Sequence, residues 1–416
     1  MKNHNKILFA LAVLLSQTLT TQINAQEEAV EINGFARNYT GLLFDNGDYS
    51  ILQNTLDLSL KHRRKNIGFF ANPFIYKYSY QDDYFDFREL YVDIYTEKLD
   101  LRIGKQQIVW GQADGVFITD IVSPLNLTEF LLWDFNEIRM GVNAVKAIYY
   151  PHPDHDIEVV WIPSFTPSLL PGEGSIWRPS MSFPIVPTFD YSNVLVNTNI
   201  KNSEIFVRYS LSKSFLDLQL IGASTWDDIA SNYVQMQVDS TMNLTGIIVR
   251  PEHSRLLLGG MNFSASLGDF VLRGEAAYYD GKRFSTLDPY ADGALVEKGY
   301  LNYVVGLDRT LGDWRLSTQF IQKVILDYDD LIINDEVDNT MTFMVNKTFF
   351  RDQLRLEMFS YVGLNNQDAL LRLRAFYFPY DGIGIELGTN LFLGDHGTFG
   401  QYSNNNMVYS RLKYSF

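Results

Sequence analysis

The chain alternates hydrophobic and polar positions with a period of two along most of its length. In residues 353–361, for example, Leu354, Leu356 and Met358 alternate with Arg355 and Glu357. This period places apolar side chains on one face of a strand and charged side chains on the other. The sequence therefore predicts an all-β protein. The same alternation occurs in residues 52–61, 88–97 and 270–279.

Turn residues divide this pattern into eighteen predicted strands. Connectors of two to four residues alternate with connectors that are mostly far longer. Uncertain boundaries leave sixteen to twenty strands open, and residues 227–253 contain a further candidate hairpin. The predicted strands are 31–44, 50–62, 66–79, 86–96, 99–109, 138–150, 155–163, 204–212, 215–226, 254–266, 270–280, 300–311, 314–326, 339–350, 353–364, 369–378, 383–393 and 405–416.

Strands with one apolar and one charged face fit two architectures. In a soluble sandwich the apolar faces point into a core. In a membrane β-barrel they face lipid, and the charged faces line a wet interior. An even strand count with short turns at one end and long loops at the other is typical of the barrel. We therefore predict a transmembrane antiparallel β-barrel of about eighteen strands, with at least one long outer loop folded into the pore.

Both ends of the chain carry signals of export to the outer membrane. Lys2 and Lys6 precede an apolar run and a small residue, Ala25, which predicts a signal peptide over residues 1–25 that is removed before Gln26. Residues 26–416 would form one barrel domain. The last residues form an amphipathic pattern with Tyr414 and Phe416 on its apolar face. This pattern resembles the terminal strand of outer-membrane barrels, which the barrel assembly machinery recognises.

Composition narrows the partners. The formal net charge of −15 argues against nucleic acid, which requires a basic face. Many aspartates fall in predicted outer loops, where they would be solvated or bridge cations to lipopolysaccharide. The absence of cysteine excludes disulfides and a lipoprotein anchor. The sequence leaves the oligomeric state and the solute open.

Two stretches resemble a known family. Residues 102–126 contain Gly104, Gln106, Trp110, Gly111, Asp120 and Pro124, and residues 392–416 contain Gly394, Asp395, Phe399, Gly400, Asn405, Tyr409, Arg411, Tyr414 and Phe416. With residues 268–281 between them, they resemble Gram-negative porin-like outer-membrane proteins of unknown function. The chain is more loosely similar to alginate-export and carboxylate-selective porins. The resemblance implies a barrel and a passive conduit, without implying a solute.

The long connector 110–137 is the candidate pore constriction. Eighteen strands enclose a channel wide enough to need narrowing before it selects a solute. The connector is rich in apolar residues, which are unfavourable in open solvent and would pack well against the barrel wall. Long ordered loops are also usually functional. A loop at the outer rim is the alternative. We expect Trp110 at the end of the wall, and the constriction to involve Trp110, Gln112, Asp114, Asp120 and Glu129. The proline-rich connector 164–203 is a second candidate, as a lid or a second inward loop.

Basic residues follow the predicted inner face. Arginine binds carboxylates in a bidentate manner, and rings of basic residues favour anions in pores. Alternatively, these residues pair with acids on neighbouring strands and stiffen the wall. The candidate pore-lining basic residues are Arg102, Arg139, Arg273, Arg315, Lys323, Arg355, Arg372, Arg374 and Arg411, and Arg208 and Lys413 share the face.

The sequence favours a channel over an enzyme. No histidine lies at mid-strand beside a serine, as a barrel lipase would need, and the close pair His152 and His155 lacks the usual further metal ligands. We therefore predict no catalytic residue, cofactor or metal, and a passive channel for small solutes, with organic anions favoured. A conduit for hydrophobic molecules, suggested by aromatic loop residues, and a non-conducting adhesin or scaffold are the alternatives.

Overall fold

The structure is a computed structural model that describes residues 29–79, 82–179, 183–241 and 243–416. The predicted signal peptide lies outside the described residues. Eighteen strands form one closed antiparallel sheet within the described residues, which confirms the predicted fold class. They are β1 (Glu31–Leu43), β2 (Tyr49–Arg64), β3 (Ile67–Tyr78), β4 (Tyr84–Tyr95), β5 (Leu99–Gln106), β6 (Val142–His152), β7 (His155–Ile162), β9 (Glu204–Lys213), β10 (Leu216–Trp226), β13 (Arg255–Leu267), β14 (Phe270–Ser285), β15 (Leu295–Leu311), β16 (Trp314–Ile325), β17 (Val337–Phe349), β18 (Leu354–Gly363), β19 (Asp368–Tyr380), β20 (Ile383–Leu393) and β21 (Met407–Ser415).

The last strand closes the barrel on the first. β21 pairs antiparallel with β1, with Phe35 opposite Ser415 and Leu43 opposite Met407. The backbone of Phe416 exchanges two hydrogen bonds with Gly34, at 2.9 and 3.0 Å. Closure satisfies the edge groups of both strands, as a sheet in lipid requires.

Burial along the strands is the reverse of that in a soluble protein. On β2, Thr55 and Asp57 are buried, whereas Leu56 between them is 39% exposed. On β21, Arg411 is 4% exposed and Leu412 is 55% exposed. The polar faces therefore point into the barrel and the apolar faces point outward, as in a barrel with a lipid-facing wall.

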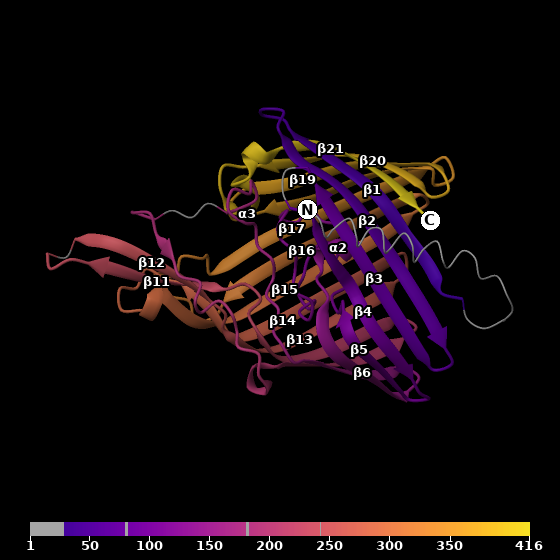
Figure 1. Cartoon of the computed structure of the whole chain (residues 1–416), viewed down its shortest axis with the longest axis horizontal. Coiled ribbons are helices and arrows are strands. Elements are labelled where there is room, and N and C mark those ends of the chain that lie inside the picture. Colours follow the sequence, from indigo (N-terminus) through magenta and orange to yellow (C-terminus); the bar gives the residue numbers. More distant parts are fainter. Residues whose placement is uncertain (1–28, 80–81, 180–182, 242) are drawn as a thin grey trace, which may run out of the picture.

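Loop lengths sort by end, as the sequence predicted. The turns after β2, β4, β6, β9, β13, β15, β17 and β19 are short, and the connections at the opposite end are mostly longer. The candidate hairpin in 227–253 forms β11 (Ser231–Val238) and β12 (Leu244–Glu252), which join β8 (Thr188–Phe189) in a separate three-stranded sheet. This hairpin projects beyond the barrel wall at the end with the long loops (Figure 1).

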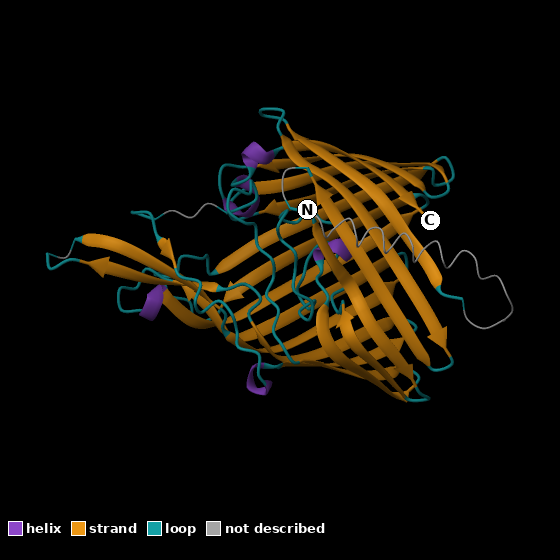
Figure 2. Ribbon diagram, in the orientation of Figure 1, coloured by secondary structure: helices purple, strands orange, loops and turns teal. Residues whose placement is uncertain are grey.

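Helices contribute little to the fold. α2 (Phe135–Ile138) and α3 (Gly397–Gly400) are single turns, as are the 3-10 segments η1 (Ile200–Asn202), η2 (Asp292–Ala294) and η3 (Ser403–Asn405). Over the described part of the chain, no helix has the length and apolar character needed to cross a membrane. Figure 2 shows loops passing through the space that the strands enclose.

Candidate functional site: a loop folded into the barrel

Residues 107–141, between β5 and β6, fold into the barrel rather than over its rim. This confirms that a long loop enters the pore. The loop packs on β13 and β14 on one side, on β1 to β4 on another, and reaches β16, β18 and β19. We call this segment the inner loop. Because the inner loop contacts strands on several sides of the barrel, it divides the lumen.

Glu275 on β14 is the main anchor of the first half of the inner loop. One carboxylate oxygen accepts the backbone N–H groups of Gln112 and Ala113, at 2.5 and 2.6 Å. The other accepts the N–H and the hydroxyl of Thr119, at 3.0 and 2.7 Å. The loop thus curls around one buried carboxylate, whose charge strengthens each of the four hydrogen bonds.

Trp110 lies inside the barrel, so the expectation that it sits at the end of the wall was wrong. Its ring is 2% exposed, and its Nε1 donates to Glu158 at 2.8 Å. Its carbonyl accepts the side-chain amide of Asn262 at 3.1 Å, and its ring packs edge-on against Phe206. An indole with a satisfied N–H is well suited to such a buried position. Trp110 therefore starts the inward turn of the loop.

Asp120 and Arg139 form an ion pair that joins the two arms of the inner loop. Both side chains are buried, and Asp120 also accepts the backbone N–H of Trp110 at 3.2 Å. The guanidinium carbon of Arg139 lies 3.5 Å from the ring centroid of Phe135. The sequence had placed Arg139 on a strand that lines the pore. This was wrong, because β6 begins only at Val142 and Arg139 belongs to the loop.

Asp114 occupies the tip of the inner loop and faces two arginines on the wall. Its carboxylate is 3.3 Å from Arg315 on β16 and 3.8 Å from Arg273 on β14. Burial raises the pKa of Asp114, against the opposing effect of the two guanidinium groups. The next residue is fixed by Tyr361, whose hydroxyl donates to the Gly115 carbonyl at 2.7 Å.

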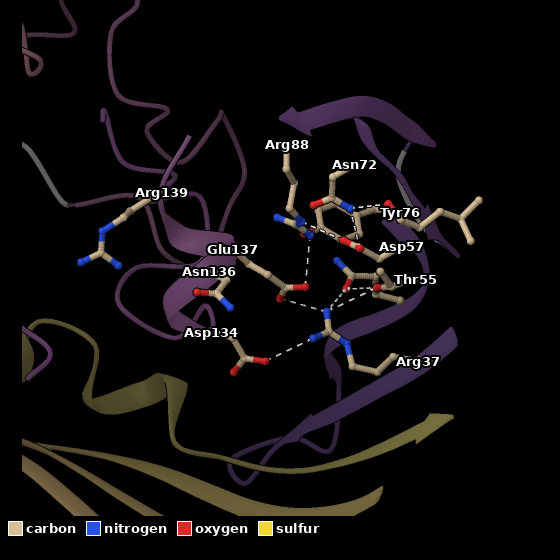
Figure 3. Close-up of polar contacts among 12 residues, drawn as sticks. Arg37, Thr55, Asp57, Asn72, Tyr76, Arg88, Asp134, Asn136, Glu137 and Arg139 are labelled. Carbon is tan, nitrogen blue, oxygen red and sulfur yellow. Dashed lines mark hydrogen bonds and ion pairs between the residues drawn. The ribbon is translucent and has the colours of Figure 1, made fainter. Parts of the chain in front are cut away.

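A buried charge network holds the second half of the inner loop (Figure 3). Glu137 on α2 accepts from Arg37 at 3.0 Å and from Arg88 at 3.2 Å. Arg88 also donates to Asp57 at 2.8 Å and to the Tyr76 hydroxyl at 2.6 Å. The network ties the single turn α2 to β1, β2, β3 and β4.

Asp134 extends this network to the last strand. Its carboxylate is 2.7 Å from Arg411 on β21 and 3.3 Å from Arg37 on β1. Burial acts to raise the pKa of Asp134, but Arg411 and Arg37 outweigh it and hold the pKa well below its usual range. For Glu129 burial outweighs the effect of the same two arginines and raises the pKa to about 8.

The connector 163–203 packs against the inner loop. Leu169 exchanges backbone hydrogen bonds with Leu125 and Leu127, at 2.9 and 2.8 Å. Further along, the Trp177 carbonyl accepts the Tyr402 hydroxyl at 3.0 Å, and the Trp177 ring is buried against Phe392. The segment therefore crosses from β7 to the loop between β20 and β21, which supports its interpretation as a lid.

Most of the candidate basic residues are paired across neighbouring strands. The pairs are Arg102 with Asp93, Arg208 with Glu158, Arg273 with Asp308, Lys323 with Asp338, Arg374 with Glu357 and Arg411 with Glu386. Arg315 instead faces Asp114 on the inner loop. For these residues the wall-stiffening interpretation accounts for the geometry.

Three of the candidate basic residues form no ion pair with a carboxylate of the described chain. The Arg355 guanidinium lies 4.2 Å from the ring centroid of Phe376, and the Lys413 ammonium lies 4.2 Å from that of Phe35. Arg372 donates to the carbonyls of Leu131 and Leu132 in the inner loop, at 3.0 and 3.2 Å. The direct contacts of these three cations are therefore ring faces and backbone carbonyls rather than carboxylates.

These three residues line one cavity. It has a volume of about 520 Å³ and lies between the inner loop and the wall formed by β17 to β21 and β1. Along β18 the cavity extends from Tyr361 to Arg355, and Arg355 lies next to the short turn that precedes this strand. The size falls within the range of small-molecule sites. Carboxylates line the same space, from the inner loop (Asp114, Asp134 and Glu137) and from the wall (Glu357 and Glu386).

Sequence reasoning missed Arg37, Arg88 and Glu137. Alternation along β1 puts Arg37 on the inner face, so that residue could have been found. Arg88 could not, because the pairing of β3 with β4 shifts register between Ala71 and Pro73. This irregularity places Arg88 inside, next to Glu89, although strict alternation would point it outward. Nothing in the local sequence around Glu137 predicts a buried anchor.

The aromatic loop residues that suggested a hydrophobic conduit are mostly used in packing. Phe130 and Trp177 contact Phe392 and Tyr402, and Trp133 stacks on Tyr76. Phe165 packs on Trp226 and His253, and Trp161 is 39% exposed.

Within the described part of the chain, the close histidine pair does not belong to a metal-binding group. Across the turn between β6 and β7, the rings of His152 and His155 contact each other. Over the described residues, no three or more His, Asp or Glu side chains gather in a metal-binding group.

Comparison with known proteins places the chain in a family. A family model described as "Protein of unknown function (DUF1302)" matches residues 75–300, more than half of the sequence. The chain belongs to this family. The DUF1302 match covers β4 to β14 and the whole inner loop, so the inner loop is part of the matched region. No curated protein matches the sequence.

Solved barrels share the fold of this DUF1302 chain. Pseudomonas aeruginosa OccK8 (OprE) matches with a TM-score of 0.55 at 10% identity, over 94% of this chain and 98% of its own. Acinetobacter baumannii OccAB2 matches with a TM-score of 0.55 at 8% identity, over 93% and 98%. P. aeruginosa OpdK, crystallised with vanillate, matches with a TM-score of 0.53 at 8% identity, over 93% and 98%. At these identities the likeness concerns the fold.

Proposed function

We propose that the protein is a passive channel of the bacterial outer membrane, reached after removal of residues 1–25, that passes small organic anions. The outward apolar face suits a barrel in lipid, and the inner loop supplies a constriction. The constriction would involve Trp110, Gln112, Asp114, Asp120 and Glu129. Tyr414 and Phe416, both on the outer face, would serve as the assembly signal. The proposal assigns no catalytic residue and no cofactor.

The observation that carries the proposal is the cavity with Arg355, Arg372 and Lys413 on its lining. A solute with a carboxylate could replace the weak partners of these cations by charge-assisted hydrogen bonds. Phe35, Phe359 and Phe376 on the same lining offer apolar contact to the rest of such a solute. OpdK, one of the similar barrels, was crystallised with the aromatic carboxylate vanillate.

Single-channel recording in a planar bilayer tests the proposal, with potassium chloride gradients for ion preference and benzoate as the probe anion. We expect the wild-type barrel to prefer anions and its chloride current to fall when benzoate is added. The double variant Arg355→Gln, Lys413→Gln should lose most of both effects.

Arg309→Gln is the matched control, because Arg309 neighbours Asp269 in a short turn, away from the lumen cavity, and should leave both effects unchanged. A cation preference in the wild type, or an unchanged benzoate effect in the double variant, would contradict the anion proposal. Absence of conductance even after deletion of residues 112–135 would contradict the channel itself and favour a non-conducting scaffold.

A further inference from the structure

The outer wall carries an apolar groove that the transport function does not use. It lies across β16 to β21 and has a volume of about 570 Å³. One side is a row of directly opposed residues: Trp314, Lys347, Leu356, Ala375 and Leu387. The other side is a parallel row, two residues further toward the long loops, that runs from Val345 on β17 to Val408 on β21.

A change in side-chain size produces the groove. Ala375 lies between Leu356 on β18 and Leu387 on β20, which are 43% and 57% exposed. The small alanine between two projecting leucines leaves a trough in the lipid-facing wall. Neighbouring strands lie about 4.8 Å apart, and the rows of opposed residues cross several of them. The trough is therefore elongated across the strands.

One end of the groove is positively charged. Lys347 lies close to the short-turn end of β17, and its ammonium is 4.6 Å from the ring centroid of Trp314 and 4.7 Å from that of Phe349. Within the described residues, Lys347 forms no ion pair with a carboxylate. Tryptophan and phenylalanine beside a lysine at the end of a membrane-spanning strand match the level of lipid headgroups.

We propose that this groove binds one anionic phospholipid, with an acyl chain along the trough and the headgroup phosphate at Lys347. The inference rests on the proposed membrane location, and it is independent of what passes through the lumen. A trough lined mostly by apolar side chains suits an acyl chain, which needs no hydrogen-bond partner. Charge complementarity at Lys347 favours an anionic headgroup over a zwitterionic one.

Native mass spectrometry of the intact barrel in detergent tests the inference, with phosphatidylglycerol and phosphatidylcholine as the two probes. We expect one tightly retained lipid per barrel, with phosphatidylglycerol preferred. Ala375→Leu should fill the trough and abolish retention of both lipids. Lys347→Gln should reduce the preference for phosphatidylglycerol about fivefold, the effect of one basic residue at the surface.

Two variants serve as controls. Ala276→Leu adds the same volume on β14, at a position that does not line the groove, and Lys98→Gln removes an exposed charge from the turn between β4 and β5. Retention that is equal in Ala375→Leu and the wild type would overturn the inference, as would a preference unchanged by Lys347→Gln. Conductance recorded from the same Ala375→Leu sample separates loss of the lipid site from failure of the channel.

Discussion

Thr119 on the inner loop gives both its backbone N–H and its hydroxyl to a single carboxylate oxygen of Glu275, at 3.0 and 2.7 Å. These two residues are 156 positions apart in the sequence and meet only because the loop enters the barrel. The second oxygen of the same carboxylate holds Gln112 and Ala113. A loop held this way is a partition that one side-chain change can release.

Glu275→Ala should release the first half of the inner loop while the barrel remains closed. Each hydrogen bond to a charged group contributes about 1.5–3 kcal/mol, so four of them dominate the local docking energy. We expect single-channel conductance to rise several-fold and the loop to become accessible to protease. Glu297→Ala, at an exposed position on β15, is the control. Unchanged conductance in Glu275→Ala would show that the loop stays in place without this anchor.

Asp114→Asn should raise the preference for anions. The substitution removes the negative charge of the loop tip and leaves Arg315 without its carboxylate partner, whereas Arg273 keeps Asp308. One charge at close range in an aqueous pore contributes roughly 1 kcal/mol, or about fivefold in the anion-to-cation permeability ratio. Reversal potentials in a potassium chloride gradient measure this ratio. A lower ratio in the variant would mean that Asp114 does not border the ion path.

Glu137→Gln should destabilise the inner loop strongly, because Arg37 and Arg88 would remain buried without their shared carboxylate. Breaking a buried pair by removing one partner costs about 3–5 kcal/mol. Urea unfolding in detergent, followed by tryptophan fluorescence, would record the loss. Glu173→Gln removes an exposed carboxylate 3.8 Å from Arg178 and should have almost no effect. Equal unfolding midpoints for the two variants would contradict the anchoring role of Glu137.

The anion-to-cation permeability ratio should depend on pH through Glu129, whose pKa is raised to about 8 by burial. Below that pH the side chain is neutral, and above it the side chain is ionised and adds a negative charge near Arg411 and Arg37. The anion-to-cation permeability ratio should therefore fall as the pH rises through about 8. Glu129→Gln keeps the neutral form and should remove this step. A step of the same size in the variant would assign the titration to another group.

The barrel could be predicted from the amino-acid pattern alone. Alternation with a period of two, an even number of strands and the sorting of connector lengths follow from local chemistry, since each strand must show one face to lipid and one to water. The alternation also put Arg355, Arg372 and Lys413 on the inner face. These features depend on neighbouring residues in the chain, so they can be recognised without the fold.

Which of the inner charges lack a carboxylate partner depends on contacts that form only in the folded barrel. Arg374 and Arg355 look alike in sequence, but a neighbouring strand supplies Glu357 to the first and an aromatic ring to the second. Arg88 turns inward through a shift in strand register, and Arg139 leaves the wall for the loop. Ion pairing depends on register and on long-range contacts, which hydrophobic periodicity does not encode. The local alternation of apolar and polar residues therefore predicts the barrel, whereas the site depends on residues that come together only when the barrel closes and the inner loop folds into it.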